Sequence, residues 1–268
     1  MTTIVSFHAH PDDEAIGTGG TLARAAAEGH RTVLVYGTGG ELGEVPDGFL
    51  PPGETLGQRR AAEVAAAADV LGVERVVFLG YLDAGMDGEP SNGDPACFWQ
   101  ADVDEAAERL AAVLRDEDAA VLTIYDDHGG YGHPDHIQVH RVGVAAAQLA
   151  GTPHVLEMTM NRDHMRALMV AAAEAGDLPD DLDPDDGPDF GEDSTFGSPA
   201  DIITTAVDVT GYLDVKRAAM AAHASQIPAD SWFLAMPEEA FAAAFGTEWF
   251  IRRGVASTPD TWLLPSEA

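Results

Sequence analysis

The stretch Ile4-Val5-Ser6-Phe7-His8-Ala9-His10-Pro11-Asp12-Asp13-Glu14 runs from an apolar segment directly into a cluster of polar side chains. Ile4–Phe7 is short and apolar, as expected of a buried β-strand. A helical pattern follows from about Gly19 to Glu28, and Arg31–Tyr36 is a second apolar run of strand length. A strand, a helix and a strand in this order predict a βαβ unit.

The same alternation continues along the chain. Helical patterns cover Thr55–Leu71 and Asp102–Arg115, and strand patterns cover Arg75–Leu79, Ala120–Tyr125 and His154–Met160. We therefore expect a Rossmann-like α/β fold, with a mostly parallel sheet and helices on both faces, within residues 1–160. Residues 161–268 would complete the same domain as a smaller C-terminal part, with a strand at Ile202–Val209, a helix at Tyr212–Ala224 and a closing segment at Phe241–Arg253.

The composition is that of a soluble globular protein, with 46% apolar and 22% charged residues among 268. No apolar run approaches the roughly 20 residues of a membrane span, and the N-terminus lacks the basic region of a signal peptide. A cytoplasmic location is the expectation. Cys97 is the single cysteine, which excludes an intramolecular disulfide and a cysteine-based zinc cluster.

The chain is strongly negative: it has 14 Lys and Arg but 46 Asp and Glu, which gives a net charge of −32. Nucleic acids and anionic membranes are poor partners for such a chain, since both bind basic surfaces. A hydrated surface suited to solubility or a salty cytoplasm explains the charge better than a cationic substrate. Residues 177–193, of which 9 are acidic, predict a solvated loop, with a substrate lid as the weaker alternative.

The first polar cluster follows the first predicted strand. The spacing of His10 and Asp13 lets both side chains reach one metal ion from a tight turn, and an imidazole with a carboxylate suits zinc. The adjacent Asp12 suits a general base. The alternative is a helix N-terminus at which acidic residues favour the helix dipole.

The second cluster, Tyr131-Gly132-His133-Pro134-Asp135-His136, follows the strand at Ala120–Tyr125. Two histidines three residues apart offer a metal ligand and a polarising group. The alternative is a surface loop in which Asp135 caps a helix that begins near His136. Because ligands bind at the carboxyl ends of parallel strands, the two clusters should meet there. Together they offer three metal ligands and leave one open position, as a catalytic zinc site requires.

The His-Pro-Asp-Asp-Glu run, the His-Pro-Asp-His run and the Arg60-Ala61-Ala62-Glu63 step between them resemble the LmbE-like, or PIG-L, family of zinc N-deacetylases. The resemblance covers roughly residues 3–160, with weaker support to about residue 253. It implies zinc as cofactor and a small amino-sugar substrate, since family members deacetylate N-acetylglucosaminyl lipids or N-acetylglucosaminyl inositol, or cleave mycothiol conjugates.

The resemblance also implies roles for single residues. It makes His10, Asp13 and His136 the zinc ligands. Asp12 would be the general base, His133 would steady the oxyanion, and Asp135 would orient His133. Either His133 or protonated Asp12 could protonate the leaving amine, and the sequence does not choose between them. If His133 acts as a cation, the carboxylate of Asp135 is the local partner that would raise the pKa of its imidazole.

Some substrate contacts follow from the same resemblance, and others from position along the chain. Arg60 matches an arginine that contacts a substrate sugar, and Tyr131 matches a tyrosine that helps to bind the reacting carbonyl. Asp83 and Met86 lie in a loop after the third strand that could line the pocket. His223 resembles part of a C-terminal motif and would approach the site, although a packing role is equally open.

Other functions stay open at this point. An amidase acting on a larger thiol conjugate would use the same chemistry. The run Gly17-Thr18-Gly19-Gly20 raises a nucleotide-binding Rossmann module or dehydrogenase, although close helix–sheet packing explains these glycines better. A non-catalytic metal-binding module would need four saturated ligands. A homo-oligomer is also left open.

Overall fold

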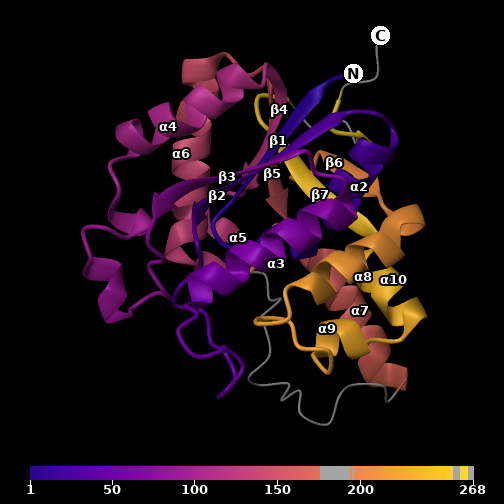
Figure 1. The fold of residues 1–268 in the computed structure, drawn as a ribbon. Helices are drawn as coiled ribbons and strands as arrows, with labels where there is room; N and C mark the ends of the chain where they lie inside the picture. Colours follow the sequence, from indigo (N-terminus) through magenta and orange to yellow (C-terminus); the bar gives the residue numbers. More distant parts are fainter. Residues whose placement is uncertain (176–193, 195, 256–259, 265–268) are drawn as a thin grey trace.

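The computed structural model describes residues 1–175, 194, 196–255 and 260–264, and its elements form layers around a central sheet (Figure 1). The acidic stretch 177–193, predicted as a loop or lid, lies outside these residues. Within the described part of the chain, no helix has the length and apolar character needed to cross a membrane.

The sheet has seven strands in the order β3-β2-β1-β4-β5-β7-β6. Five strands pair in parallel, namely β1 (Thr3–His8), β2 (Arg31–Thr38), β3 (Arg75–Tyr81), β4 (Ala119–Tyr125) and β5 (His154–Thr159). β7 (Thr247–Arg252) runs antiparallel to β5 and to β6 (Thr205–Asp208). The predicted mostly parallel sheet is confirmed, and the C-terminal part extends it.

Helices occupy the segments between these strands. They are α1 (Asp13–Gly17), α2 (Gly19–Ala27), α3 (Leu56–Leu71), α4 (Val103–Asp116), α5 (Gly129–Gly132), α6 (Pro134–Ala150), α7 (Arg162–Ala175), α8 (Leu213–Ala222), α9 (Trp232–Ala235) and α10 (Glu238–Phe245). Short 3₁₀ turns lie at Pro90–Gly93, Phe98–Gln100 and Thr210–Tyr212.

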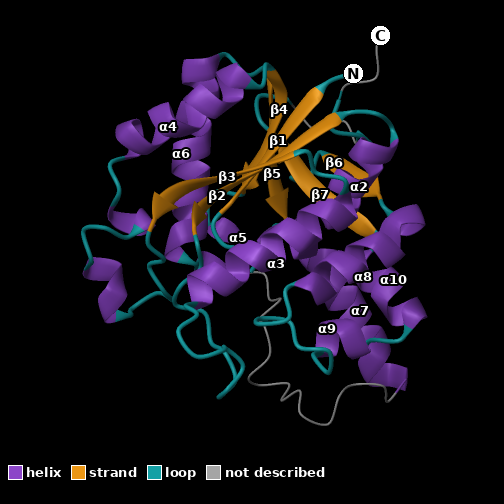
Figure 2. Ribbon diagram, viewed as in Figure 1, coloured by secondary structure: helices purple, strands orange, loops and turns teal. Residues whose placement is uncertain are grey.

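Helices cover both faces of the sheet, as predicted. On β2, Val33 and Val35 join the core formed with α4 and α6, whereas Leu34 and Tyr36 join the core formed with α2, α3 and α8. Figure 2 shows these helix groups on opposite sides of the strands. This alternation buries the strand on both sides, which explains why it is continuously apolar in sequence.

Local signals fix the helix ends. Thr55 accepts a hydrogen bond from the backbone N–H of Gln58, whose side chain binds back to the Thr55 N–H, and α3 ends at Gly72 in the left-handed conformation. Asp102 caps α4, as predicted. The helix expected near His136 begins instead at Pro134, with His133 as its N-cap.

The order of the strands places the site. β1 lies between β2 and β4, so the chain leaves β1 toward one side of the sheet and later enters β4 on the other. At such a switch point the connections diverge and leave a crevice at the carboxyl ends of the two strands. Both polar clusters follow these ends.

Candidate active site

The two polar clusters meet at the switch point. His10 follows β1, while His133 and His136 lie at the start of α6, beyond β4. The ring centre of His133 is 4.6 Å from that of His10 and 5.0 Å from that of His136. Segments more than 100 residues apart in sequence thus form one buried cluster, as the sequence predicted.

Asp13 lies at distances from both predicted imidazole ligands that suit a shared divalent metal. Oδ2 of Asp13 is 3.5 Å from Nδ1 of His10 and 3.4 Å from Nε2 of His136. Ligand bonds of about 2.0–2.2 Å in a tetrahedral zinc site separate neighbouring ligand atoms by about 3.3–3.6 Å. Nε2 of His136 is buried and has no hydrogen-bond partner among the described residues. A metal ion would satisfy this nitrogen, so the residues fit such an ion.

Two groups of side chains bring potential ligand atoms all within 4.8 Å of one another, one of His10, His133 and His136 and one of His10, Asp83 and Asp135. Several of their atoms are engaged, since Nδ1 of His133 accepts a backbone hydrogen bond and Asp83 accepts two. Oδ2 of Asp13 likewise accepts the backbone N–H of His10, and Oδ1 of Asp135 is buried without a hydrogen-bond partner among the described residues. We favour the group containing Asp13 because its Oδ2 lies near both imidazoles, including the unpartnered Nε2 of His136.

Asp12 is held beside the metal ligands by Arg60. Oδ2 of Asp12 lies 3.1 Å from Nη2 of Arg60, and this guanidinium also donates to the carbonyl oxygens of Pro11 and Gly40. Burial raises the pKa of Asp12 to about 7, although Arg60 lowers it, and the neighbouring Asp13 raises it further. A carboxyl group with such a pKa suits proton transfer near neutral pH.

Asp135 does not have the role that the sequence predicted. Its Oδ2 lies 3.2 Å from Nε2 of His10 and accepts a hydrogen bond from the backbone N–H of Ala84, and it does not contact His133. Instead, the backbone N–H of Asp135 donates to Nδ1 of His133 at 3.1 Å. His133 is the N-cap of α6, so its ring takes the place of a capping side chain.

The surroundings of His133 favour a neutral imidazole. Burial, followed by the neighbouring charges of His10 and His136, lowers the pKa of His133 to about 3. The carboxylate of Asp135, predicted to raise this pKa, does not bind the ring, and the cationic role of His133 stays a prediction. Because Nδ1 accepts a hydrogen bond, the ring proton belongs on Nε2.

The predicted substrate-binding residues differ in their exposure to solvent. Tyr131 is 43% exposed, with its ring 5.0 Å from that of His136, and Met86 is 52% exposed on its loop. Asp83 is buried with Oδ1 3.5 Å from Nε2 of His10; burial opposes its ionisation, but the contact with His10 lowers its pKa. His223 is completely buried against Glu14 and presents no surface to a substrate.

Sequence reasoning missed two contacts of the site. The ring of Tyr125 stacks on that of His136 with centres 4.2 Å apart. The position of Tyr125 at the end of a predicted strand is the only signal in the sequence for this contact. Oε1 of Glu14 lies 2.5 Å from Nε2 of His223. Burial lowers the pKa of His223, but the Glu14 carboxylate outweighs this and the pKa is raised. Glu14 lies within the quoted motif, where a helix N-terminus is only the alternative to a functional cluster.

The Gly-rich turn is filled by the protein itself. Oε1 of Glu248 accepts the N–H of Gly20, Oε2 accepts the N–H of Thr21, and Lys216 binds the same carboxylate. A Cβ added at Gly20 would lie 2.5 Å from Cβ of Val209. This N-terminus of α2 is where a nucleotide pyrophosphate would bind. The glycines therefore serve close packing, and the nucleotide-binding alternative does not fit.

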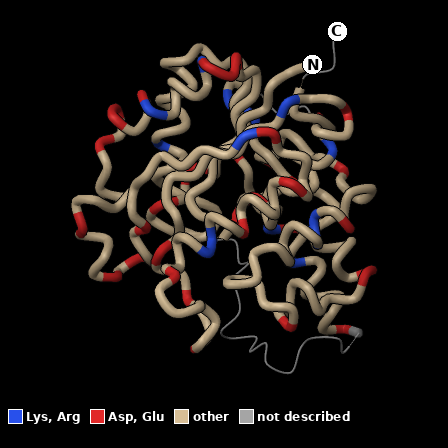
Figure 3. Tube along the Cα trace, viewed as in Figure 1, with Lys and Arg blue, Asp and Glu red and all other residues tan. Residues whose placement is uncertain are grey.

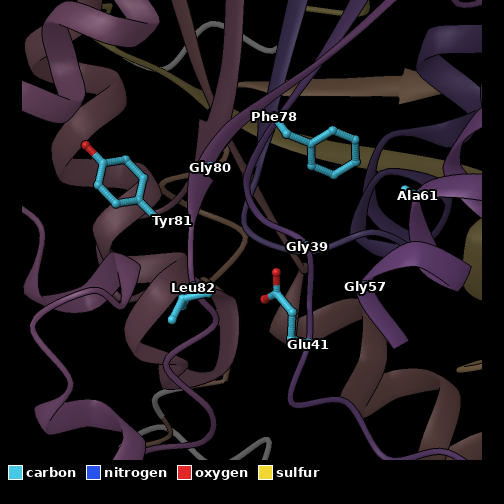
Figure 4. Close-up of a pocket in the computed structure, with 8 residues that line it drawn as sticks. All are labelled: Gly39, Glu41, Gly57, Ala61, Phe78, Gly80, Tyr81 and Leu82. Carbon is cyan, nitrogen blue, oxygen red and sulfur yellow. The ribbon is translucent and has the colours of Figure 1, made fainter. Parts of the chain in front are cut away.

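A cavity of about 240 Å³ opens beside the cluster (Figure 4). Its lining comes from the ends of β2 and β3 and from α3, and consists of Gly39, Glu41, Gly57, Ala61, Phe78, Gly80, Tyr81 and Leu82. The figure shows the rings of Phe78 and Tyr81 on opposite sides of β3. Glu41 connects this cavity to the cluster, because its Oε2 accepts the backbone N–H of Asp83. The cavity is thus next to the reacting groups and does not contain them.

Comparisons with known proteins show which proteins the chain is similar to. The chain is 42% identical over 266 residues to the 1D-myo-inositol 2-acetamido-2-deoxy-alpha-D-glucopyranoside deacetylase of Acidothermus cellulolyticus, covering 96% of this chain and 90% of the relative. The structure is similar to that of N,N'-diacetylchitobiose deacetylase from Pyrococcus horikoshii (TM-score 0.57, 22% identity, 94% of this chain and 83% of that one). It is equally similar to the 4-carboxy-2-hydroxymuconate hydratase GalB of Pseudomonas putida (TM-score 0.57, 19% identity, 96% and 98%), so the fold alone does not define the reaction.

The profile of one family, GlcNAc-PI de-N-acetylase (PIG-L), matches residues 5–147, which include both polar clusters and Arg60. With this match and the 42% identical relative, the chain belongs to the PIG-L family of deacetylases.

Proposed function

We propose that this chain is a zinc-dependent hydrolase that removes the acetyl group from the nitrogen of an N-acetylglucosamine unit joined to inositol. The observation that carries the proposal is the convergence of His10, Asp13 and His136 beside the carboxyl group of Asp12. The substrate is inferred from the printed name of the Acidothermus cellulolyticus relative.

Zinc is the metal that this ligand set suits best. Two imidazoles and one carboxylate hold zinc in many hydrolases and leave a position open. When bound, the ion supplies Lewis acidity, which polarises the amide carbonyl and makes hydroxide available near neutral pH.

The protein's own groups supply the proton transfers and the oxyanion contacts. Asp12 takes the proton of the attacking water, because its carboxyl group is buried and Arg60 fixes it in place. Nε2–H of His133 donates to the developing oxyanion without a change of charge. Burial raises the pKa of Tyr131, so its phenol stays protonated and offers a second donor at the exposed side of the site.

The leaving amine takes its proton from Asp12. His133 has a pKa of about 3 and holds no second proton near neutral pH, so it is a poor acid for this step. Asp12 is protonated once the water has attacked, and it can pass that proton to the leaving nitrogen. One carboxyl group thus acts first as base and then as acid.

The competing amidase differs in its product. Incubation with N-acetylglucosaminyl inositol should release one acetate and one primary amine for each bond cleaved, whereas a thiol conjugate carrying a larger acyl group should react slowly. Faster cleavage of the conjugate, with no acetate formed from the acetylated sugar, would favour the amidase. Failure to release amine from either compound would favour a non-catalytic metal-binding module. A cytoplasmic location and a homo-oligomer stay predictions from the sequence.

A further inference from the structure

A buried pair joins the first turn after β1 to the C-terminal part of the chain. His223, directly after α8, places Nε2 2.5 Å from Oε1 of Glu14 in α1, and neither residue has any exposed surface. The two residues are 209 positions apart. This contact touches neither the metal ligands nor the open side of the site, so the reaction as described does not yet use it.

The same carboxylate also holds the backbone of Asp12. Oε2 of Glu14 accepts the backbone N–H of Asp12 at 3.0 Å. Asp12 has φ of 109° and ψ of −31°, a conformation that residues other than glycine rarely adopt and that the surroundings must maintain. On its other side, Arg60 binds the carbonyl oxygen of Pro11 and the carboxylate of Asp12.

We propose that His223 is a positioning residue that acts through Glu14 to keep Asp12 in this strained conformation, and so aims its carboxylate at the reacting water. The inference rests on the proposed role of Asp12 as general base. His223 fixes one oxygen of Glu14, and the other oxygen is then presented to the Asp12 N–H. Without the imidazole, the Glu14 carboxylate can rotate and Asp12 can relax to a common backbone conformation.

A second contact of the same segment provides a matched control. Ser225 donates its backbone N–H and its hydroxyl to the buried carboxylate of Glu63 in α3, at 2.9 and 2.6 Å. This contact also anchors the end of α8 to the first half of the chain. The contact between Ser225 and Glu63 does not reach Asp12. Its loss therefore measures how loosening this segment alone affects the activity.

The test compares His223→Ala with Ser225→Ala on N-acetylglucosaminyl inositol. His223→Ala should lower kcat by about 10²-fold, the effect of a misplaced catalytic group, with KM and metal content close to those of the wild type. Ser225→Ala should change kcat by only a few-fold. In His223→Gln the side-chain amide can donate to Glu14, so this variant should recover part of the loss and also serves if His223→Ala does not fold.

The double variant Asp12→Ala/His223→Ala separates positioning from other roles. If His223 acts only through Asp12, the double variant should be no slower than Asp12→Ala. A further loss equal to that of the single His223→Ala change would overturn the proposal, as would equal losses in His223→Ala and Ser225→Ala.

A crystal structure of His223→Ala provides a readout that needs no turnover. Asp12 should leave its positive φ in that variant and keep it in Ser225→Ala. An unchanged Asp12 φ in His223→Ala would overturn the inference. If the wild-type protein released no amine, the proposed function would fail, while the Asp12 φ would still decide whether His223 positions it.

Discussion

At the scale of single residues, Asp12 and Arg60 set the pH at which the reaction can run. A general base works only when ionised, so the rate should fall as the pH falls through the pKa of Asp12. Burial raises this pKa to about 7 and Arg60 lowers it; a bound metal cation also favours the carboxylate, which places the limb of the wild-type profile at or below about 7.

Arg60→Met should therefore move the acidic limb of the kcat/KM profile to higher pH, because the carboxylate loses its cationic neighbour. Arg59→Met is the control, since Arg59 binds Glu54 and not Asp12. Profiles of the two variants against pH give the measurement. Coincident acidic limbs for Arg60→Met and the wild type would show that Arg60 does not tune Asp12.

Asp135 should act on the metal through His10. Its carboxylate contacts Nε2 of His10, which fixes the ring so that Nδ1 faces Asp13. Partners of this kind typically contribute 10–100-fold to metal affinity or activity, so we expect Asp135→Asn to weaken zinc binding by about that factor. Competition with a chelator measures the affinity. Asp127→Asn is the control, because that side chain is 82% exposed. Equal zinc affinities in the two variants would contradict this role.

At the scale of elements, Glu117 joins the starts of two strands to the end of α4. It is the C-cap residue of α4, and its carboxylate lies 2.6 Å from Nε of Arg31 in β2 and 2.7 Å from Nη1 of Arg75 in β3. The hydrogen bond from Arg31 and the nearby Arg75 charge lower the pKa of Glu117, and burial opposes them. A lowered pKa stabilises the fold above the ordinary value of about 4.3, and this contribution disappears as the pH falls through the lowered value.

Glu117→Gln should therefore lower the free energy of unfolding by about 1 kcal/mol at pH 7, a modest loss because the arginines are partly exposed. The difference in the free energy of unfolding between this variant and the wild type should disappear at low pH. Urea unfolding at pH 7 and at successively lower pH measures it. Glu108→Gln, at an exposed pair with Arg115, should cost less. A difference that stayed constant down to low pH would show that the lost contact is not electrostatic.

The elements that the sequence revealed are those with a local pattern. Strands β1 to β5 and helices α2, α3 and α4 follow from apolar periodicity and end signals such as Thr55, Gly72 and Asp102. The stretch Phe241–Arg253 was expected only to close the fold, and it contains the end of α10 and the whole of β7. β7 owes its place to antiparallel pairing with β5, a long-range contact that local sequence does not encode.

The candidate site was predictable to a similar extent. The two motifs located His10, Asp13 and His136 because strand order brings their segments together. The contacts of Asp135 and His223 were not predictable, since they depend on the direction of single side chains. The direction of the Asp135 side chain follows from the start of α6. His133 is the N-cap of this helix, and the residue after it is a proline, which is favoured in the first turn.

At the scale of the whole molecule, the net charge of −32 dominates. Figure 3 shows acidic positions spread around the described chain and outnumbering basic ones. Like charges at this density repel in the compact state, and salt screens them over about 10 Å at 0.1 M. We expect the melting temperature to rise between low salt and about 0.5 M KCl, with NaCl giving the same result. A melting temperature that fell with salt would mean that attractive ion pairs outweigh the repulsion.

The central claim is that one metal ion, held by His10, Asp13 and His136, works with Asp12 to release acetate. Titrating metal-free protein with zinc while following acetate release from N-acetylglucosaminyl inositol tests this claim most directly. The rate should rise in proportion to zinc and reach its plateau at about one zinc per chain. Asp12→Ala should bind the same zinc but release acetate roughly 10²–10⁴-fold more slowly. Acetate release at the full rate without metal, or no release at any zinc content, would contradict the account.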